Sequence, residues 1–543
     1  MIVQRKSFEY NYFLMLVVVY FLALQFRPVF SPIEVKCAEF IREMVMSGNF
    51  FSLQLNSEIC KEGVLPGLQL SALLAKIIHP WRFVLRLFSF GSVCCCAWLM
   101  YYFFRIKCYS RLTAQFAVCI FLTMPAVFIA GTSVMPDMFF VLLTILCYGV
   151  LYSCQERFTR IYSAVLVYLC SGMIAGFACC MKDFSGLLLP LTAFTLFLIT
   201  SKRWKDLLLF PGIMFIESLM ILLLWNLLIP HVEYVHLLSD LTAVHTRFGI
   251  RLCSLKSVLY LICGGILWLP FFVASCIGLG KKLWNNNMHR MTVLFLVVAL
   301  LYYILFDASL ASCLFILFPM TVLTAAGMRS FLIRYWGERL LNTVAGTLLF
   351  FDLTTVVLFF IGFFTNLPLP VIFYKDEAWL WLLAIVFLIS SAVGVIFLFS
   401  EKQLCQKIRC LLFAFFPFFL ILMCVYPRAV AGQIAPASLL KNIPALTQDT
   451  MIATVTDLLP DVCWGLKRRD IVLLDSGNPT AKWMQRLGNK KFASVLLVLK
   501  ERDYERGMRY GIFPDNAVWY KKWDRDVPCV LVKYQYNTKD LKK

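Results

Sequence analysis

The sequence predicts a polytopic α-helical membrane protein with a small α/β domain at its C-terminus, on the exported side. Hydrophobic residues make up 61% of the 543 residues, and the mean hydropathy is +0.79. About thirteen apolar runs follow one another, each long enough for a transmembrane helix, which satisfies its backbone hydrogen bonds internally. A more polar segment, 432–543, follows the last run. These observations predict a membrane domain, 1–431, and a separate soluble domain, 432–543.

The first apolar run is not followed by a small-residue cleavage pattern, so it is interpreted as an uncleaved first span. The predicted spans are 11–29, 83–104, 112–131, 137–154, 160–180, 186–200, 205–229, 256–280, 291–307, 308–327, 340–364, 378–399 and 407–426.

The links between spans alternate in charge, and this alternation predicts the topology. Lys and Arg gather in every second link: Arg105–Arg111, Gln155–Arg160, Ser201–Lys205, Lys281–Arg290, Met328–Arg339 and Glu401–Arg409. The positive-inside rule places these links and the N-terminus in the cytoplasm. An odd number of spans then places the tail on the exported side. This distribution explains much of the net charge of +20 without a nucleic-acid partner, while basic residues in the tail are suited to anionic lipid headgroups.

Two segments outside the spans have their own predicted structure. The outer loop 30–82 contains two amphipathic stretches, Glu34–Met46 and Leu68–Ile78, which are typical of helices that lie at the membrane interface. The tail alternates apolar strand-like runs with a helix-like stretch at Pro479–Leu487; the runs are Asp470–Leu474, Ser494–Leu499 and Cys529–Tyr534.

Most of the 21 cysteines lie in the predicted spans, where they behave as small apolar residues. Cys37 and Cys60 in the first outer loop, and Cys463 and Cys529 in the tail, face the exported side, where either pair could form a disulfide. The cysteine spacing excludes a zinc finger.

Ionisable residues at the outer rim of an apolar bundle are costly to place, which makes them candidates for function. Asp137 and Lys182 each stand almost alone in an apolar context. A carboxylate at this boundary can accept a proton from a hydroxyl, and a lysine can bind a lipid-linked phosphate. The charges of the first outer loop include Glu39 and Glu43, which we expect to cap helices at the headgroup level.

Several motifs, in order and on the predicted outer face, resemble those of integral-membrane GT-C glycosyltransferases of the lipid A 4-amino-4-deoxy-L-arabinose transferase and protein mannosyltransferase-like family. They are Glu34–Met44 followed by Ser47–Phe50, Pro136–Met138, Met181–Pro190, and, in the tail, Trp464–Ile471 and Val530–Tyr534. The resemblance implies transfer of a sugar from undecaprenyl phosphate to lipid A at the periplasmic face of the inner membrane. It also implies contacts with membrane lipids and no nucleotide sugar.

The same resemblance implies roles for individual residues. Glu34 and Asp137 would be catalytic, and Lys36, Lys182 and Arg42 would bind the donor phosphate. A divalent metal is a further possibility, with Glu62, His231 and His236 as its ligands. The alternative for these histidines is an interfacial position without a metal.

The chain also departs from the family pattern. Ile33 stands where the family has an aspartate, and Ser309–Phe315 lacks the lysine and histidine of the family's corresponding motif. Three hypotheses follow: an active transferase with Glu34 or Asp137 as base, a transferase with another sugar or an acceptor such as protein or another glycan, or an inactive scaffold that binds lipid. A transporter is disfavoured, because the polar groups gather at the rim and not at mid-membrane.

The topology predicts that positions 137 and 182 face the exported side and that position 281 faces the cytoplasm. Asp137→Cys and Lys182→Cys should react with a membrane-impermeant maleimide in intact spheroplasts, beyond the background of the unsubstituted chain. Lys281→Cys should react only after permeabilisation. Reaction of either outer position only after permeabilisation would contradict this topology.

Overall fold

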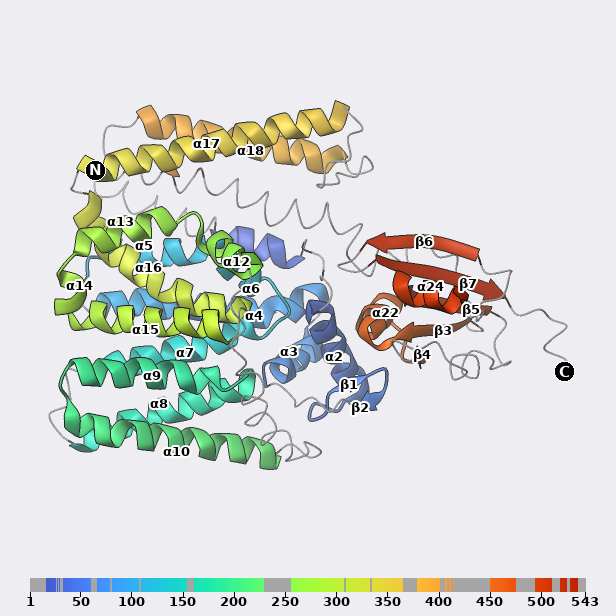
Figure 1. The fold of residues 1–543 in the computed structure, drawn as a ribbon, viewed down its shortest axis with the longest axis horizontal. Helices are drawn as coiled ribbons and strands as arrows, with labels where there is room; N and C mark the ends of the chain where they lie inside the picture. The colour runs from blue at the N-terminus through green and yellow to red at the C-terminus, as the bar shows by residue number, and fades with distance from the viewer. Residues whose placement is uncertain are drawn as a thin grey trace.

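The structure is a computed structural model in which a helical bundle is joined to a mixed α/β domain (Figure 1). It describes residues 16–25, 27, 29, 33–59, 66–78, 81–106, 109–153, 161–228, 255–306, 309–332, 335–364, 378–400, 406–407, 410–411, 414, 450–474, 494–509, 518–524 and 528–535.

The bundle begins with the helix Leu16–Gln25. Its further helices are α4 (Trp81–Ile106), α5 (Arg111–Leu122), α6 (Pro125–Gly131), α7 (Asp137–Ser153), α8 (Ile161–Met181), α9 (Ser185–Thr200), α10 (Trp204–Leu228), α12 (Leu255–Gly265), α13 (Leu269–Leu279), α14 (Lys282–Asn285), α15 (Asn287–Leu305), α16 (Leu310–Leu332), α17 (Tyr335–Phe364) and α18 (Ala378–Ser400). Among the described residues, five helices are long and apolar enough to cross a membrane, or six if a bent pair is one span.

This count covers only the described residues and leaves the predicted thirteen spans unconfirmed, but it shows that two of the predicted spans are broken. The predicted span 112–131 is divided into α5 and α6, which meet at an angle of 69°. Pro125 occupies the first turn of α6, where its missing N–H is tolerated. The predicted span 256–280 is divided into α12 and α13, with Pro270 again in the first turn of the second helix.

Close contact between α8 and α10 depends on two glycines at the spacing that favours helix association in membranes. A Cβ at Gly172 would lie 2.7 Å from the Cβ of Glu217, and one at Gly176 would lie 2.8 Å from the Cβ of Ile221. Larger side chains at these two positions would push the helices apart.

The C-terminal domain is a five-stranded sheet in the order β4-β3-β5-β7-β6, with β3 parallel to β4 and β5, and β7 antiparallel to β5 and β6. Its elements are β3 (Thr450–Val455), α22 (Leu459–Leu466), β4 (Ile471–Leu474), β5 (Ser494–Lys500), α24 (Glu501–Arg509), β6 (Val518–Asp524) and β7 (Pro528–Gln535). The three predicted strands are present. β3, β6 and the two helices were not predicted, and Pro479–Leu487 lies outside the described residues.

The first outer loop lies between the bundle and this domain (Figure 1). It forms α2 (Ile33–Ser47), α3 (Pro66–Ile77) and a hairpin of β1 (Gln54–Leu55) and β2 (Glu58–Ile59). Asn56 in the hairpin turn donates to the carbonyl of Ile471 at 2.7 Å and accepts from its N–H at 3.0 Å. The hairpin thereby pairs with the edge strand β4. Leu55 packs against the core of the C-terminal domain, while Trp464 packs against the core around α2.

The charged face of α2 is buried, which corrects our expectation that it lies among lipid headgroups. Glu39 and Glu43 are fully buried. Arg42 donates to Glu39 at 2.5 and 2.8 Å and lies 3.3 Å from Glu43. Arg469 completes the network at 3.0 Å from Glu43. Burial raises the pKa of the Glu43 carboxyl, an effect opposed by Arg469. The network joins α2 to the segment that follows α22, since Arg42 also donates to the carbonyl of Arg468.

Arg42→Gln should weaken this junction strongly, because it leaves two carboxylates buried beside each other without their shared cation. Breaking a buried ion pair on one side costs about 3–5 kcal/mol. Lys500→Gln is the control, since its partner Asp457 is 59% exposed and exposed pairs contribute about 0–1 kcal/mol. Thermal unfolding of the purified chain in detergent measures both. Equal shifts in Tm would contradict a structural role for the network.

Candidate functional site

The candidate site lies at the end of the bundle that faces the first outer loop. The buried carboxylate of Glu34 holds the elements beneath this site together. The Glu34 carboxylate is 3.5 Å from the guanidinium groups of both Arg27 and Arg86, and it accepts from the backbone N–H of Val134 at 3.1 Å. Arg27 also donates to Thr132 at 3.0 Å. Glu34 thus ties α2 and α4 to the loop between α6 and α7.

Arg86 was not singled out from the sequence, although an arginine inside an apolar run is a functional signal. It is fully buried on α4 and donates to the carbonyls of Leu24 and Arg27 at 3.1 and 2.5 Å. These carbonyls belong to the end of the first helix, where orphan acceptors need partners.

The loop tied down by Glu34 leads directly into Asp137. Pro136 ends the loop, and Asp137 is the first residue of α7, where a negative charge is stabilised by the helix dipole. Close packing fixes the position of this turn. A Cβ at Gly67 on α3 would lie only 2.7 Å from the Cβ of Pro136. The glycine therefore lets α3 lie directly against the start of α7.

The centre of the site is an ion pair between two residues singled out from the sequence. Lys182, directly after α8, donates to Oδ1 of Asp137 at 3.1 Å and to Ser309 at 3.3 Å. The side chain of Asp137 is 5% exposed and that of Lys182 is 26% exposed. Oδ2 of Asp137 is buried and makes no hydrogen bond with the described residues. The site thus contains a cation that solvent can reach and a buried carboxylate oxygen available to accept a proton.

The neighbouring Asp183 has a different role. Its Oδ1 accepts from the N–H of Ser185 at 2.9 Å and from the Ser185 hydroxyl, which satisfies the backbone donor of the first residue of α9. The carboxylate of Asp183 is therefore hydrogen-bonded at the start of α9, while the carboxylate of Asp137 pairs with Lys182.

An apolar groove adjoins the site. Its volume is about 380 Å³, and it lies between α3, α7, α8 and α10. Phe139 and Met181, which line it, are close in the chain to Asp137 and Lys182; the other lining residues are Pro66, Gln69, Leu70, Leu73, Leu143, Phe177 and Trp225. A charged pair beside an apolar groove is suited to a ligand with an anionic head and a hydrocarbon chain.

The two other candidates for binding the donor phosphate, Lys36 and Arg42, lie on α2. Lys36 is half-buried, with its ammonium 5.6 Å from the ring centroid of Phe40. Arg42 is held by Glu39 and Glu43 in the junction with the C-terminal domain.

The predicted metal ligands Glu62, His231 and His236 lie outside the described residues, as does Cys60. The described part of the chain contains no group of three His, Cys, Asp or Glu residues placed to hold a metal.

Comparison with known proteins agrees with the resemblance seen in the sequence motifs. Residues 71–239, which include Asp137 and Lys182, match the family model of dolichyl-phosphate-mannose-protein mannosyltransferase. The chain is 26% identical to the undecaprenyl phosphate-alpha-4-amino-4-deoxy-L-arabinose arabinosyl transferase of Shewanella sediminis, over 85% of this chain and 84% of the relative. It is 24% identical to the protein of the same name from Pectobacterium atrosepticum, over 84% and 82%.

Two crystal structures share the fold. ArnT from Cupriavidus metallidurans in the apo state has a TM-score of 0.73 and covers 98% of each chain, at 14% identity. The same protein bound to undecaprenyl phosphate has a TM-score of 0.70, with 96% of this chain and 97% of that chain covered, also at 14% identity. The expected GT-C helical membrane fold is confirmed at this level.

Glu34→Gln should destabilise the packing of α2, α4 and the loop between α6 and α7, because it leaves Arg27 and Arg86 buried without their shared anion. The expected cost is about 3–5 kcal/mol, seen as a lower Tm of the purified chain. Glu58→Gln is the matched control, because Glu58 is an exposed residue of the hairpin. If Glu34→Gln unfolded at the same temperature as Glu58→Gln, Glu34 would not stabilise the packing of these three elements.

Proposed function

We propose that this chain is a membrane glycosyltransferase that moves 4-amino-4-deoxy-L-arabinose, or a similar sugar, from undecaprenyl phosphate to a phosphate of lipid A. The reaction takes place at the outer face of the inner membrane. Similarity to arabinosyl transferases extends over most of the chain. The observation that carries the proposal is the Asp137–Lys182 pair, 3.1 Å apart, whose chain neighbours Phe139 and Met181 line an apolar groove.

Lys182 binds the donor phosphate in this mechanism. Its ammonium is 26% exposed and lies beside Asp137 and Ser309, so an anionic oxygen can approach it from the solvent side. A charge-assisted hydrogen bond there stabilises the negative charge that develops on the departing phosphate. The adjoining groove takes the first isoprene units of the donor.

Asp137 acts on the acceptor. The bond between the sugar C1 and the donor phosphate oxygen breaks, and undecaprenyl phosphate leaves with the electron pair. An acceptor oxygen of lipid A forms the new bond to C1. If that oxygen carries a proton, Oδ2 of Asp137 receives it, because this oxygen is buried and not otherwise hydrogen-bonded to the described residues.

Glu34 was the other candidate for this role, and its contacts favour a positioning role. Two guanidinium groups and a backbone N–H already surround its carboxylate. Arg42 has a similar structural task in the junction with the C-terminal domain. Lys36 remains the predicted second contact with the donor phosphate.

The proposed orientation has the N-terminus in the cytoplasm and the C-terminal domain in the periplasm. The basic links support it, since exposed Lys and Arg side chains gather at the end of the bundle away from the C-terminal domain; they include Arg105, Arg111, Lys202, Lys205, Lys281 and Lys282.

Asp137→Asn should lower kcat about 10²–10⁴-fold with little change in donor binding, since the loss of an acid–base group has this size. Lys182→Met should instead weaken donor binding about ten- to a hundredfold, the loss expected for a hydrogen bond to a charged group. A transfer assay with purified chain, synthetic undecaprenyl-phosphate sugar and lipid A measures both.

Glu58→Gln serves as the control with wild-type kinetics. Full transfer by Asp137→Asn would refute the assignment of Asp137. Absence of transfer by the wild-type chain, with donor binding intact, would indicate another acceptor or a scaffold that binds lipid without turnover.

A further inference from the structure

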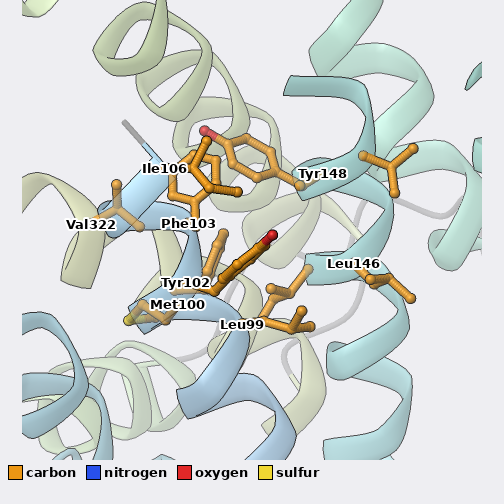
Figure 2. Close-up of a pocket in the computed structure, with 12 residues that line it drawn as sticks. Leu99, Met100, Tyr102, Phe103, Ile106, Leu146, Tyr148 and Val322 are labelled. Carbon is orange, nitrogen blue, oxygen red and sulfur yellow. The ribbon is translucent and has the colours of Figure 1, made fainter. Parts of the chain in front are cut away.

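A second cavity lies in the opposite half of the bundle from the candidate site. Its volume is about 240 Å³, and side chains from α4, α7 and α16 surround it (Figure 2). This exceeds the roughly 150 Å³ of a cavity that binds benzene. The lining residues are Leu99, Met100, Tyr102, Phe103, Ile106, Ile145, Leu146, Tyr148, Gly149, Val150, Phe318 and Val322.

The cavity is apolar and opens on the surface of the bundle. Tyr102 and Ile106, on the α4 wall, are 52% and 44% exposed. Tyr148 presents its ring to the cavity, while its hydroxyl is bound to Thr292 at 2.7 Å. An opening of this kind in a membrane-spanning bundle faces hydrocarbon, so an acyl chain is the apolar group that reaches it.

The cavity is distinct from the candidate site. Gly149 follows Asp137 by twelve residues on α7, which places it about 18 Å further along the helix axis at 1.5 Å per residue. The cavity therefore lies near the end of the bundle where the basic links gather. The apolar groove between α3, α7, α8 and α10 shares no lining residue with it.

Charge near the cavity indicates which lipid it takes. Arg105 is exposed in the last turn of α4. Tyr102, three residues earlier, and Ile106, the next residue, both line the cavity. Residues three apart on a helix lie on the same face. Arg111 is exposed at the start of α5. A lipid with its chain in the cavity would bring its headgroup to this end of α4, where the cations favour an anionic phosphate.

We propose that this cavity binds one acyl chain of an anionic phospholipid whose phosphate pairs with Arg105. Two walls of the cavity are formed by α7 and α16. The opposite ends of these helices lie at the candidate functional site, since α7 begins with Asp137 and α16 follows Ser309. The lipid fills the space between these two helices and stabilises their separation.

Gly149 offers a direct test. A Cβ built at this residue meets no atom within 4 Å, so a side chain there starts in open space. Gly149→Phe therefore fills the cavity. Gly212→Phe on α10 is the matched control, because Gly212 is also open to its surroundings but does not line the cavity.

Native mass spectrometry of the full chain in detergent, titrated with phosphatidylglycerol or with phosphatidylcholine of the same chains, gives the affinities. Phosphatidylglycerol should bind more tightly to the wild type and to Gly212→Phe. Gly149→Phe should lower its affinity at least tenfold. Arg105→Gln should lower it about fivefold, the effect of removing one cation near an anionic headgroup, and should abolish the preference over phosphatidylcholine.

If Gly149→Phe folds poorly, a thermal-shift measurement on the wild type and Arg105→Gln tests the proposal without that variant. Phosphatidylglycerol should raise the Tm of the wild type, and by less for Arg105→Gln, since a ligand stabilises the state it binds. Equal affinity of the two lipids for the wild type would overturn the proposal. Unchanged phosphatidylglycerol binding by a folded Gly149→Phe chain would also overturn the proposal. Displacement of phosphatidylglycerol by an equal amount of undecaprenyl phosphate would overturn it as well.

Discussion

The buried carboxylate of Glu34 is the contact on which the outer end of the bundle depends. An anion in this position is costly unless it is fully paired. Two arginines and a backbone N–H satisfy that requirement, and in doing so they join the first helix, α2, α4 and the loop before α7. Asp137 follows this loop directly, so the position of the proposed catalytic carboxylate is a consequence of how Glu34 is neutralised.

Charge is divided between the two ends of the molecule. At one end, acids and bases are buried and paired, in the Glu34 cluster, in the Asp137–Lys182 pair and in the junction of α2 with the C-terminal domain. At the other end, cations are exposed. The first arrangement builds a site where a phosphate can approach Lys182 beside an apolar groove. The second provides a surface for anionic headgroups, next to the cavity between α4, α7 and α16.

The membrane class, the outer-loop helices and three strands of the sheet could be predicted from the sequence, because apolar length and amphipathic periodicity carry those signals. Asp137 and Lys182 could be singled out because each stands almost alone in apolar surroundings, but the ion pair between them was not predicted. The breaks at Pro125 and Pro270 were missed, since apolar composition continues through both. Burial of Glu39 and Glu43 was also missed: their surroundings come from Arg469, more than 400 residues away in the chain, and no local pattern reports such a partner.

The most direct measurement of the central claim is mass spectrometry of lipid A from cells that lack this chain and are supplied with either the wild type or Asp137→Asn. The wild type should add the mass of one pentosamine-sized sugar to lipid A. Asp137→Asn, expressed at the same level in the membrane, should not. The same sugar adduct in both strains would contradict the role of Asp137, and its absence from both would contradict lipid A as the acceptor.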